Sequence, residues 1–129
     1  MPRDDLAARL LLALDLRDER ALASLLTPDV AMVADTGDQT GGELRGRVRV
    51  IRALLGLRMP HPDASLEIVH VNGGPGLAMR RPDGCVVGVL VIDADRGREP
   101  DGGHAIDRLW LTTAPGRLAH WNRRRPVVE

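Results

Sequence analysis

The chain has 129 residues, of which 18 are basic and 18 are acidic, so its formal net charge is zero. This length suffices for one domain with a hydrophobic core. The balanced charge predicts no direct nucleic-acid partner and no membrane partner. Lys and Tyr are absent, which excludes a Schiff-base lysine and a phenolic proton donor. We expect a single domain over residues 1–122 and a flexible basic tail over residues 123–129.

Cysteine usage and the N-terminal sequence indicate the compartment. Cys85 is the single cysteine, so no internal disulfide can form, which is typical of a cytoplasmic protein. The first five residues, M-P-R-D-D, lack the basic-then-apolar pattern of a signal peptide. No apolar run approaches the about 20 residues of a membrane span. We therefore expect a cytoplasmic location.

The first half of the chain reads as helices around a short strand. Helices are predicted over residues 4–16, 18–26 and 48–57, and strands over 29–35 and 43–45. Asp18 can cap the second helix, and Pro28 is expected to end it. In the third helix, Val48, Ile51 and Leu55 are expected to face inward.

The second half reads as a meander of strands, predicted over residues 64–71, 77–80, 85–93 and 105–113. The segment N-G-G-P-G at 72–76 and the segment R-P-D-G at 81–84 are predicted turns, because Gly and Pro favour turn geometries. A charged loop is expected over 95–103. Helices first and antiparallel neighbours afterwards predict an α+β fold, with helices packed on one face of the sheet.

The segment V-N-G-G-P-G-L at 71–77, followed by G-V-L at 88–90, resembles the C-terminal domain of sigma-J-like extracytoplasmic-function sigma factors. That domain belongs to the SnoaL-like branch of the NTF2-like superfamily. The segments L-L-T-P-D-V at 25–30 and A-P-G-R-L at 114–118 resemble the family's first-strand entry and its close. The resemblance covers residues 6–121 and implies a cone: three N-terminal helices packed on a curved antiparallel sheet, with an internal pocket.

Two segments depart from the family pattern. The chain has D-T-G-D-Q at 35–39, where the sigma-factor domains carry D-G-G-G-K, and A-P-G-R-L at 114–118 has lost the Asn and Asp of N-P-D-K-L. The chain also lacks the sigma factor's DNA-binding and polymerase-binding regions. We expect that it is not itself a sigma factor.

Asp35 is the first candidate for chemistry. It ends a predicted strand, and on the two-residue period it shares a face with Ala31 and Val33. In steroid-isomerase-like and SnoaL-like proteins an Asp at this position often acts as a base, and a partly desolvated carboxylate can accept a proton from carbon. Asp35 is thus expected at the mouth of the internal pocket. The alternative is that it caps the following loop through backbone N–H groups.

His70 and the last long strand supply the other candidates. His70 shares a strand face with Leu66 and Ile68, as a pocket acid–base group or as a half-buried histidine. Asp107 and Arg108 lie on opposite faces of their strand, and either can face inward. If Trp110 lines the pocket, Arg108 does too, because both have the same parity.

Two function classes follow from these residues. In the first, a stand-alone SnoaL-like domain binds a small hydrophobic molecule in a binding or regulatory role, with Val33, Arg80, Arg108 and Trp110 as ligand contacts. In the second, a cofactor-independent polyketide cyclase, isomerase or epoxide hydrolase uses Asp35 as general base, with His70 and Asp107 as further catalytic candidates. Both readings need no cofactor. None of the four histidines has metal-ligand spacing, so no metal site is expected.

The strand over residues 85–93 also predicts a homodimer. Its apolar residues fall on both faces: Val86, Leu90 and Ile92 on one, and Val87, Val89 and Val91 on the other. Two-sided apolar strands imply burial on both sides, and the helices can cover only one.

Overall fold

The structure of the chain is a computed structural model, and it describes residues 3–37, 41–71, 73–95 and 105–122. Four helices and six strands follow one another along this part of the chain. They are α1 (Arg3–Leu16), α2 (Glu19–Leu25), β1 (Leu26–Asp35), β2 (Gly42–Arg45), α3 (Arg47–Leu55), β3 (Ser65–Val71), β4 (Gly74–Arg80), β5 (Val86–Asp95), β6 (Ala105–Thr112) and α4 (Pro115–Asn122). The α+β class predicted from the sequence is confirmed.

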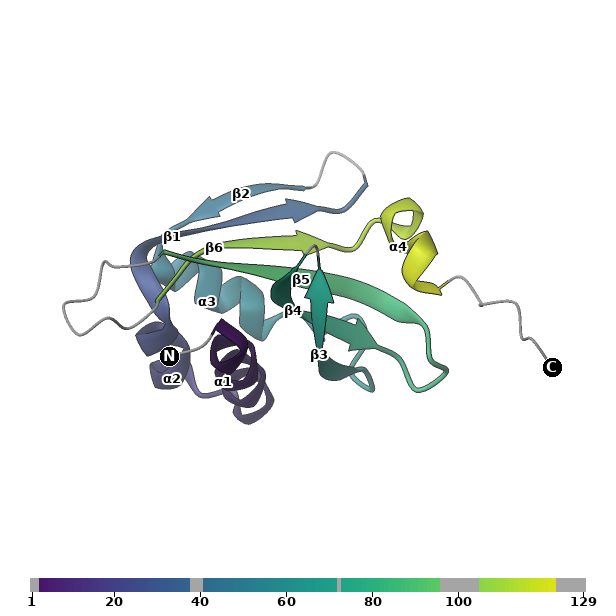
Figure 1. The fold of residues 1–129 in the computed structure, drawn as a ribbon, viewed down its shortest axis with the longest axis horizontal. Helices are drawn as coiled ribbons and strands as arrows, with labels where there is room; N and C mark the ends of the chain where they lie inside the picture. The colour runs from purple at the N-terminus through teal and green to yellow at the C-terminus, as the bar shows by residue number, and fades with distance from the viewer. Residues whose placement is uncertain (1–2, 38–40, 72, 96–104, 123–129) are drawn as a thin grey trace.

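The six strands form one sheet in the order β2-β1-β6-β5-β4-β3. As predicted, β3, β4, β5 and β6 are antiparallel neighbours in sequence order. The prediction of a purely antiparallel sheet is wrong, because β1 pairs in parallel with β6. This central parallel pair joins the two halves of the chain, and α1, α2 and α3 all lie on one side of the resulting curved sheet (Figure 1).

The face of the sheet that meets α1, α2 and α3 is called the inner face, and the opposite one the outer face. The main core lies between the inner face and these helices. Its fully buried side chains include Leu6, Leu10, Leu22, Leu26, Val30, Val50, Leu54, Leu77, Ile106 and Leu109. Leu6 and Leu10 in α1 are both fully buried, since helix positions four residues apart share a face. No helix in the described residues is long and apolar enough to cross a membrane.

The buried stripe of α3 differs from the predicted one. Val50, Ile51 and Leu54 are buried, whereas Val48 is 71% exposed and Leu55 only partly covered. The apolar residues of this segment allow two overlapping helical stripes, and the anchoring of the helix start decides between them. The Gly46 N–H donates to the Val30 carbonyl oxygen at 2.9 Å, which fixes the first turn of α3 against β1.

The hairpin from β3 to β4 is tighter than predicted. Val71 pairs with Gly74, so the connection is reduced to two residues, and Gly73 has the positive φ (81°) that glycine adopts at no steric cost. Pro75 therefore lies inside β4, opposite His70, rather than in a turn. The predicted turn at 81–84 is confirmed, since the Gly84 N–H donates to the Arg81 carbonyl oxygen at 2.8 Å.

Strand β1 begins three residues before its predicted start. The Asp18 cap of α2 is confirmed, because its Oδ1 accepts from the Ala21 N–H at 3.1 Å. Pro28, expected to end this helix, instead lies within β1. It falls where the β1–β6 register shifts, between Leu26 and Ala31, so its missing N–H costs no ladder hydrogen bond.

Helix α4 was not predicted. Its first residue is Pro115, which suits the first position of a helix because no intrahelical bond needs that N–H. The helix lies on the outer face, where Leu118 packs with Ala78, Val86 and Val89 in a second, smaller core. The predicted loop over 95–103 and the basic tail over 123–129 lie outside the described residues, apart from Asp95 at the end of β5.

Candidate functional site

The space between the sheet and the helices is almost completely filled. The internal cavity measures about 10 Å³ and is lined only by Leu14, Leu57, Leu66, Leu77, Met79, Gly88, Leu90 and Leu111. A volume of this size is about that of one water molecule, and the lining offers no side-chain hydrogen-bonding group. The spacious internal pocket that the family resemblance implies is not open in this structure.

A larger depression, here called the mouth groove, opens beside this cavity. Its volume is about 490 Å³, and it is lined by Leu57, Pro60, His61, Met79, Cys85, Val86, Val87, Thr113, Pro115, Leu118 and Asn122. Leu57 and Met79 line both the groove and the internal cavity. These two side chains therefore lie between the groove and the small internal cavity.

Three segments far apart in sequence build the groove. The turn after α3 supplies one wall, α4 supplies another, and the first residues of β5 lie between them; α4 stands at one end of the sheet, away from α2 (Figure 1). In β5, Val87 is skipped by the β4–β5 register, in which Met79 pairs with Gly88 and Arg80 with Val86. Such a bulge redirects a side chain at the edge of a site.

The Asn122 side chain fixes α4 to the start of β5. Its Oδ1 accepts from the Val86 N–H at 2.7 Å, and its Nδ2 donates to the Val86 carbonyl oxygen at 2.9 Å. Both backbone groups of Val86 are thus satisfied by one amide side chain, as they would be by a neighbouring strand. Because these groups are occupied within the protein, Asn122 shapes the groove rather than offering a free amide to a ligand.

His61 is one of the polar side chains in the groove that were not predicted as site residues from the sequence. Its backbone N–H donates to the Arg58 carbonyl oxygen at 2.9 Å, and its own carbonyl accepts from the Ala64 N–H at 3.0 Å. These bonds hold the turn that carries the imidazole. The flanking Pro60 and Pro62 are a sequence signal for a rigid loop.

Asp35 does not lie where the sequence predicted. Val30 and Met32 of β1 face the inner core, so Asp35 belongs to the outer face, and it does not line the internal cavity. Its Oδ1 accepts from the Gly37 N–H at 3.2 Å, and its Oδ2 lies 2.9 Å from Arg117 Nε. The geometry is that of the loop cap, and the expected place at the mouth of an internal pocket is wrong.

Three of the predicted ligand contacts also lie on the outer face. Val33 pairs with Trp110 across the parallel β1–β6 ladder. The Arg108 guanidinium lies 5.7 Å from the centroid of the Trp110 ring, within cation–π range. Arg108 and Trp110 share a face, as their parity predicted, but this face lies away from the internal cavity.

The remaining candidates are dispersed. His70 lies on β3, four strand positions from β1 in the sheet, which corresponds to about 19 Å at about 4.8 Å per strand. Arg80 pairs with Glu67 at 2.6 Å. Asp107 lies where the β5–β6 register shifts. Since Asp35 and His70 are too far apart to act on one bond, the acid–base constellation of the enzymatic alternative is not assembled.

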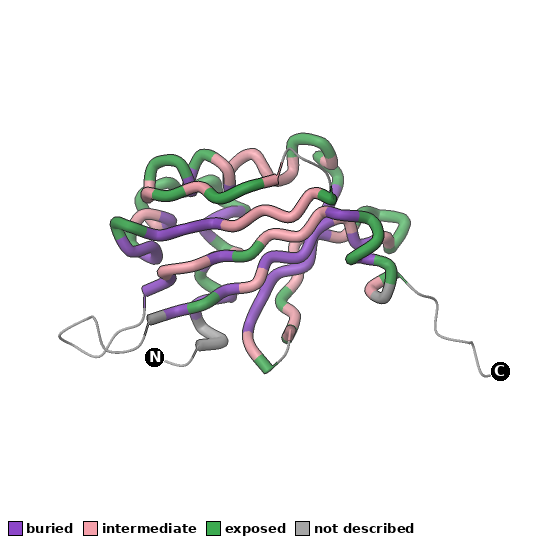
Figure 2. The backbone as a smooth tube through the Cα atoms, turned by 90° about the horizontal axis from the view of Figure 1, so that it is seen from above, coloured by how far each residue is buried: buried purple, intermediate pink, exposed green. Residues whose placement is uncertain are grey.

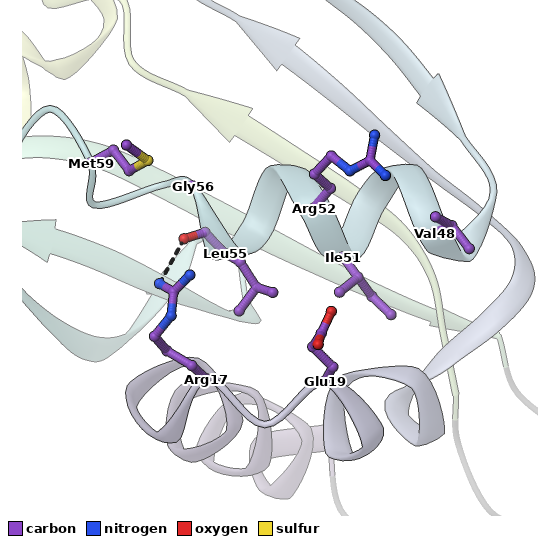
Figure 3. A pocket seen from close by; sticks show the side chains of 8 residues that line it. All are labelled: Arg17, Glu19, Val48, Ile51, Arg52, Leu55, Gly56 and Met59. Carbon is purple, nitrogen blue, oxygen red and sulfur yellow. Dashed lines mark hydrogen bonds between the residues drawn. The ribbon is translucent and has the colours of Figure 1, made fainter.

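A second apolar depression lies between the α1–α2 connection and α3, with a volume of about 370 Å³ (Figure 3). Arg17 Nη1 donates to the Leu55 carbonyl oxygen at 3.0 Å across its floor, and Val48 and Met59 lie at its rim. No residue lines both this depression and the internal cavity. Within the described residues, no group of three His, Cys, Asp or Glu could hold a metal ion.

No protein-family model and no curated protein matches the chain. Solved structures do. One is the extracytoplasmic-function sigma factor SigJ of Mycobacterium tuberculosis, with 21% identity and a TM-score of 0.63; the match covers 91% of this chain and 44% of the sigma factor chain. The present chain therefore spans less than half of the length of that protein.

Two further structures match over most of both chains. A Caulobacter vibrioides protein with a cystatin-like fold has 18% identity and a TM-score of 0.57, covering 92% of this chain and 91% of its own. A candidate isomerase of the SnoaL-like family from Agrobacterium tumefaciens has 15% identity and a TM-score of 0.58, covering 87% and 97%. The chain thus has the cystatin-like fold of the SnoaL-like and NTF2-like proteins, which confirms the sequence resemblance at the level of the fold.

Proposed function

We propose that this chain is a binding domain that holds a small, mostly apolar molecule in the mouth groove. The observation that carries the proposal is the position of Leu57 and Met79, which line both the groove and the closed internal cavity. A groove of about 490 Å³ falls in the usual range for small-molecule sites, which are largely apolar with a few polar groups. No described arrangement of acids and bases favours catalysis over binding.

The lining suggests how a ligand would lie. Its apolar part would rest on Leu57, Met79 and Val87, where desolvation is favourable. A polar end would meet His61 and Thr113, the imidazole and the hydroxyl of the groove. A methionine side chain changes its conformation more readily than a branched side chain does. Met79 would therefore adjust to a ligand that extends from the groove toward the cavity.

The likeness to part of the SigJ sigma factor supports a regulatory use of such binding. Ligand occupancy of the groove would then be sensed through α4, which forms one of its walls and is fixed to β5 by Asn122. A ligand shifts an equilibrium only through contacts that differ between states, and the α4 wall is where such contacts would form.

Fluorescence titration with anilinonaphthalenesulfonate, a probe with an aromatic body and one sulfonate group, tests the proposal. We expect saturable binding that falls at least about tenfold in the Val87→Glu variant, because the added carboxylate would be buried against the aromatic body and would repel the sulfonate. The matched control is Trp110→Ser, which removes the exposed apolar side chain of the outer face. Binding that survives Val87→Glu but is lost in Trp110→Ser would move the site to the outer face, and absence of saturable binding would refute the proposal.

We further propose that two copies of the chain pair through their outer faces. Val33, Trp110, Val91, Gly76 and Val69 lie side by side in register across five strands. Trp110 is the second residue of this row and is 39% exposed, while Val33, Val91 and Val69 are half-buried. Helix α4 covers only part of the outer face, and Figure 2 shows intermediate and exposed positions beside the buried ones in the strands. A partly exposed apolar row of this kind supports an interface.

Light scattering at micromolar concentration tests the pairing. We expect about twice the chain mass of 14.0 kDa for the parent protein. The Trp110→Glu variant should give the monomer mass, since it buries a charge from each copy in the proposed interface. A monomeric parent protein would contradict the proposal and leave the groove proposal standing.

A further inference from the structure

A third depression lies at the end of the molecule opposite α4, between α2, the start of β1 and the first residue of α3 (Figure 1). Its volume is about 600 Å³. The polar residues that line it are Arg20, Ser24, Thr27 and Arg47. We call it the arginine hollow. It shares no residue with the mouth groove, so whatever it binds is independent of the function proposed above.

Two buried polar atoms in the lining have no hydrogen-bond partner among the described residues. Thr27 is only 6% exposed, and its Oγ1 is unsatisfied. Arg47 donates from Nη2 to the Leu26 carbonyl oxygen at 2.8 Å, but its buried Nε has no acceptor. Buried polar groups are almost always paired in native proteins, because leaving one unpaired costs its full desolvation. The Arg47 Nε can only donate, and the Thr27 hydroxyl can donate as well, so a group with acceptor oxygens would satisfy both.

The charge around the hollow indicates the sign of this acceptor. Among the described residues, two guanidinium groups and no carboxylate line it. Helix α3 begins at Arg47, has no side-chain cap at Gly46 and no acidic residue in its first turn, so the positive end of its dipole is not neutralised there. Positive potential combined with unpaired donors selects a negatively charged ligand that supplies oxygen lone pairs.

We propose that the arginine hollow is a binding site for an oxyanion, a phosphate or carboxylate group. One oxygen accepts from Thr27 Oγ1 and another from Arg47 Nε, while the exposed Arg20 adds charge at the entrance. The planar guanidinium of Arg47 suits both groups, because its N–H donors match their paired oxygens. Recognition depends on the Thr27 hydroxyl, because this group has no other hydrogen-bond partner among the described residues.

Amide NMR and thermal unfolding in the presence of inorganic phosphate, and separately of acetate, test the site at constant ionic strength. We expect at least one of these anions to raise the unfolding temperature and to shift the amides of α2 and of Arg47. The anion that binds more tightly, phosphate or acetate, identifies the class of the ligand. A chloride control at equal ionic strength separates specific binding from screening.

Thr27→Val is the decisive variant, because it keeps the shape and removes only the hydroxyl. We expect it to weaken anion binding about tenfold, and to leave the anion-free protein as stable as the parent or more stable, since an unpaired buried hydroxyl is lost. Arg20→Gln, at an exposed position, should weaken binding several-fold without affecting the fold. Arg49→Gln, in the same helix but outside the hollow, is the matched control and should bind like the parent.

The proposal is overturned if neither anion binds more tightly than chloride. It is also overturned if Thr27→Val and Arg20→Gln bind the anion as tightly as Arg49→Gln. Destabilisation of the anion-free protein by Thr27→Val would likewise contradict it, because it would mean that the hydroxyl already has a partner in the free protein.

Discussion

The inner and outer faces of the sheet differ in what covers them. Neighbouring residues of β6 show this most clearly: Leu109 faces inward and is fully buried, whereas Trp110 faces outward and keeps 39% of its surface exposed. Three helices close the inner face, whereas α4 is the helix among the described residues that covers part of the outer one. Because apolar burial is the main stabilising term in folding, the inner face holds the fold together. The proposed binding surfaces therefore lie outside this core.

The largest expected effect separates the two faces directly. Leu109→Ala should lower the free energy of unfolding by about 2–5 kcal/mol, through lost burial and the cavity left behind. Trp110→Ala, one residue away, should cost less than about 1 kcal/mol in the monomer, because its ring is partly exposed. Urea unfolding of both variants, below the concentration at which copies associate, measures the difference. Equal losses would mean that the two faces contribute alike.

The next largest loss of stability is expected at Asn122, which fixes α4 to the outer face. Asn122→Ala leaves the N–H and C=O of Val86 without their side-chain partner and should cost about 1–3 kcal/mol. Asn122→Asp keeps the acceptor but sets a carboxylate oxygen against the Val86 carbonyl oxygen, so its cost should be at least that of the alanine variant. If urea unfolding gives the parent's stability for Asn122→Ala, α4 is not held by this side chain.

The smallest effect is expected at Asp35. Its ion pair with Arg117 joins two exposed side chains, and such pairs contribute between zero and about 1 kcal/mol. Asp35→Asn keeps an oxygen for the Gly37 N–H, so we expect a loss of at most about 0.5 kcal/mol and unchanged probe binding in the groove. Arg117→Gln is the matched control and should behave alike. Loss of probe binding in Asp35→Asn alone would revive the functional role predicted from the sequence.

Local signals in the sequence were sufficient for most elements. The Asp18 cap, the turn at Arg81–Pro82–Asp83–Gly84 and the β-branched run of β5 each depend on neighbouring residues, and the structure confirms all three. The order of the elements also led to the correct fold class. Helix α4 was not predicted, because Pro115 and Gly116 are poor residues inside a helix, although proline is favourable at the first helical position.

The site could not be predicted in the same way, because it depends on which face of each strand meets the helices. Strand β1 is apolar on both faces, with Val30 and Met32 on one and Ala31 and Val33 on the other, so its period does not assign Asp35 to a side. The parallel pairing of β1 with β6 joins distant parts of the chain and leaves no local signal. The mouth groove likewise needs α4, which the sequence reading lacked.

The NMR signals of labelled methionine methyl groups test the mouth groove most directly. The chain has four methionines, and three of them lie in different places: Met79 between the groove and the cavity, Met32 in the inner core, and the 79% exposed Met59 at the depression of Figure 3. On titration with anilinonaphthalenesulfonate, we expect the Met79 signal to shift and saturate while the Met32 and Met59 signals stay in place. A saturating shift of Met59 with Met79 unmoved would contradict the proposed site.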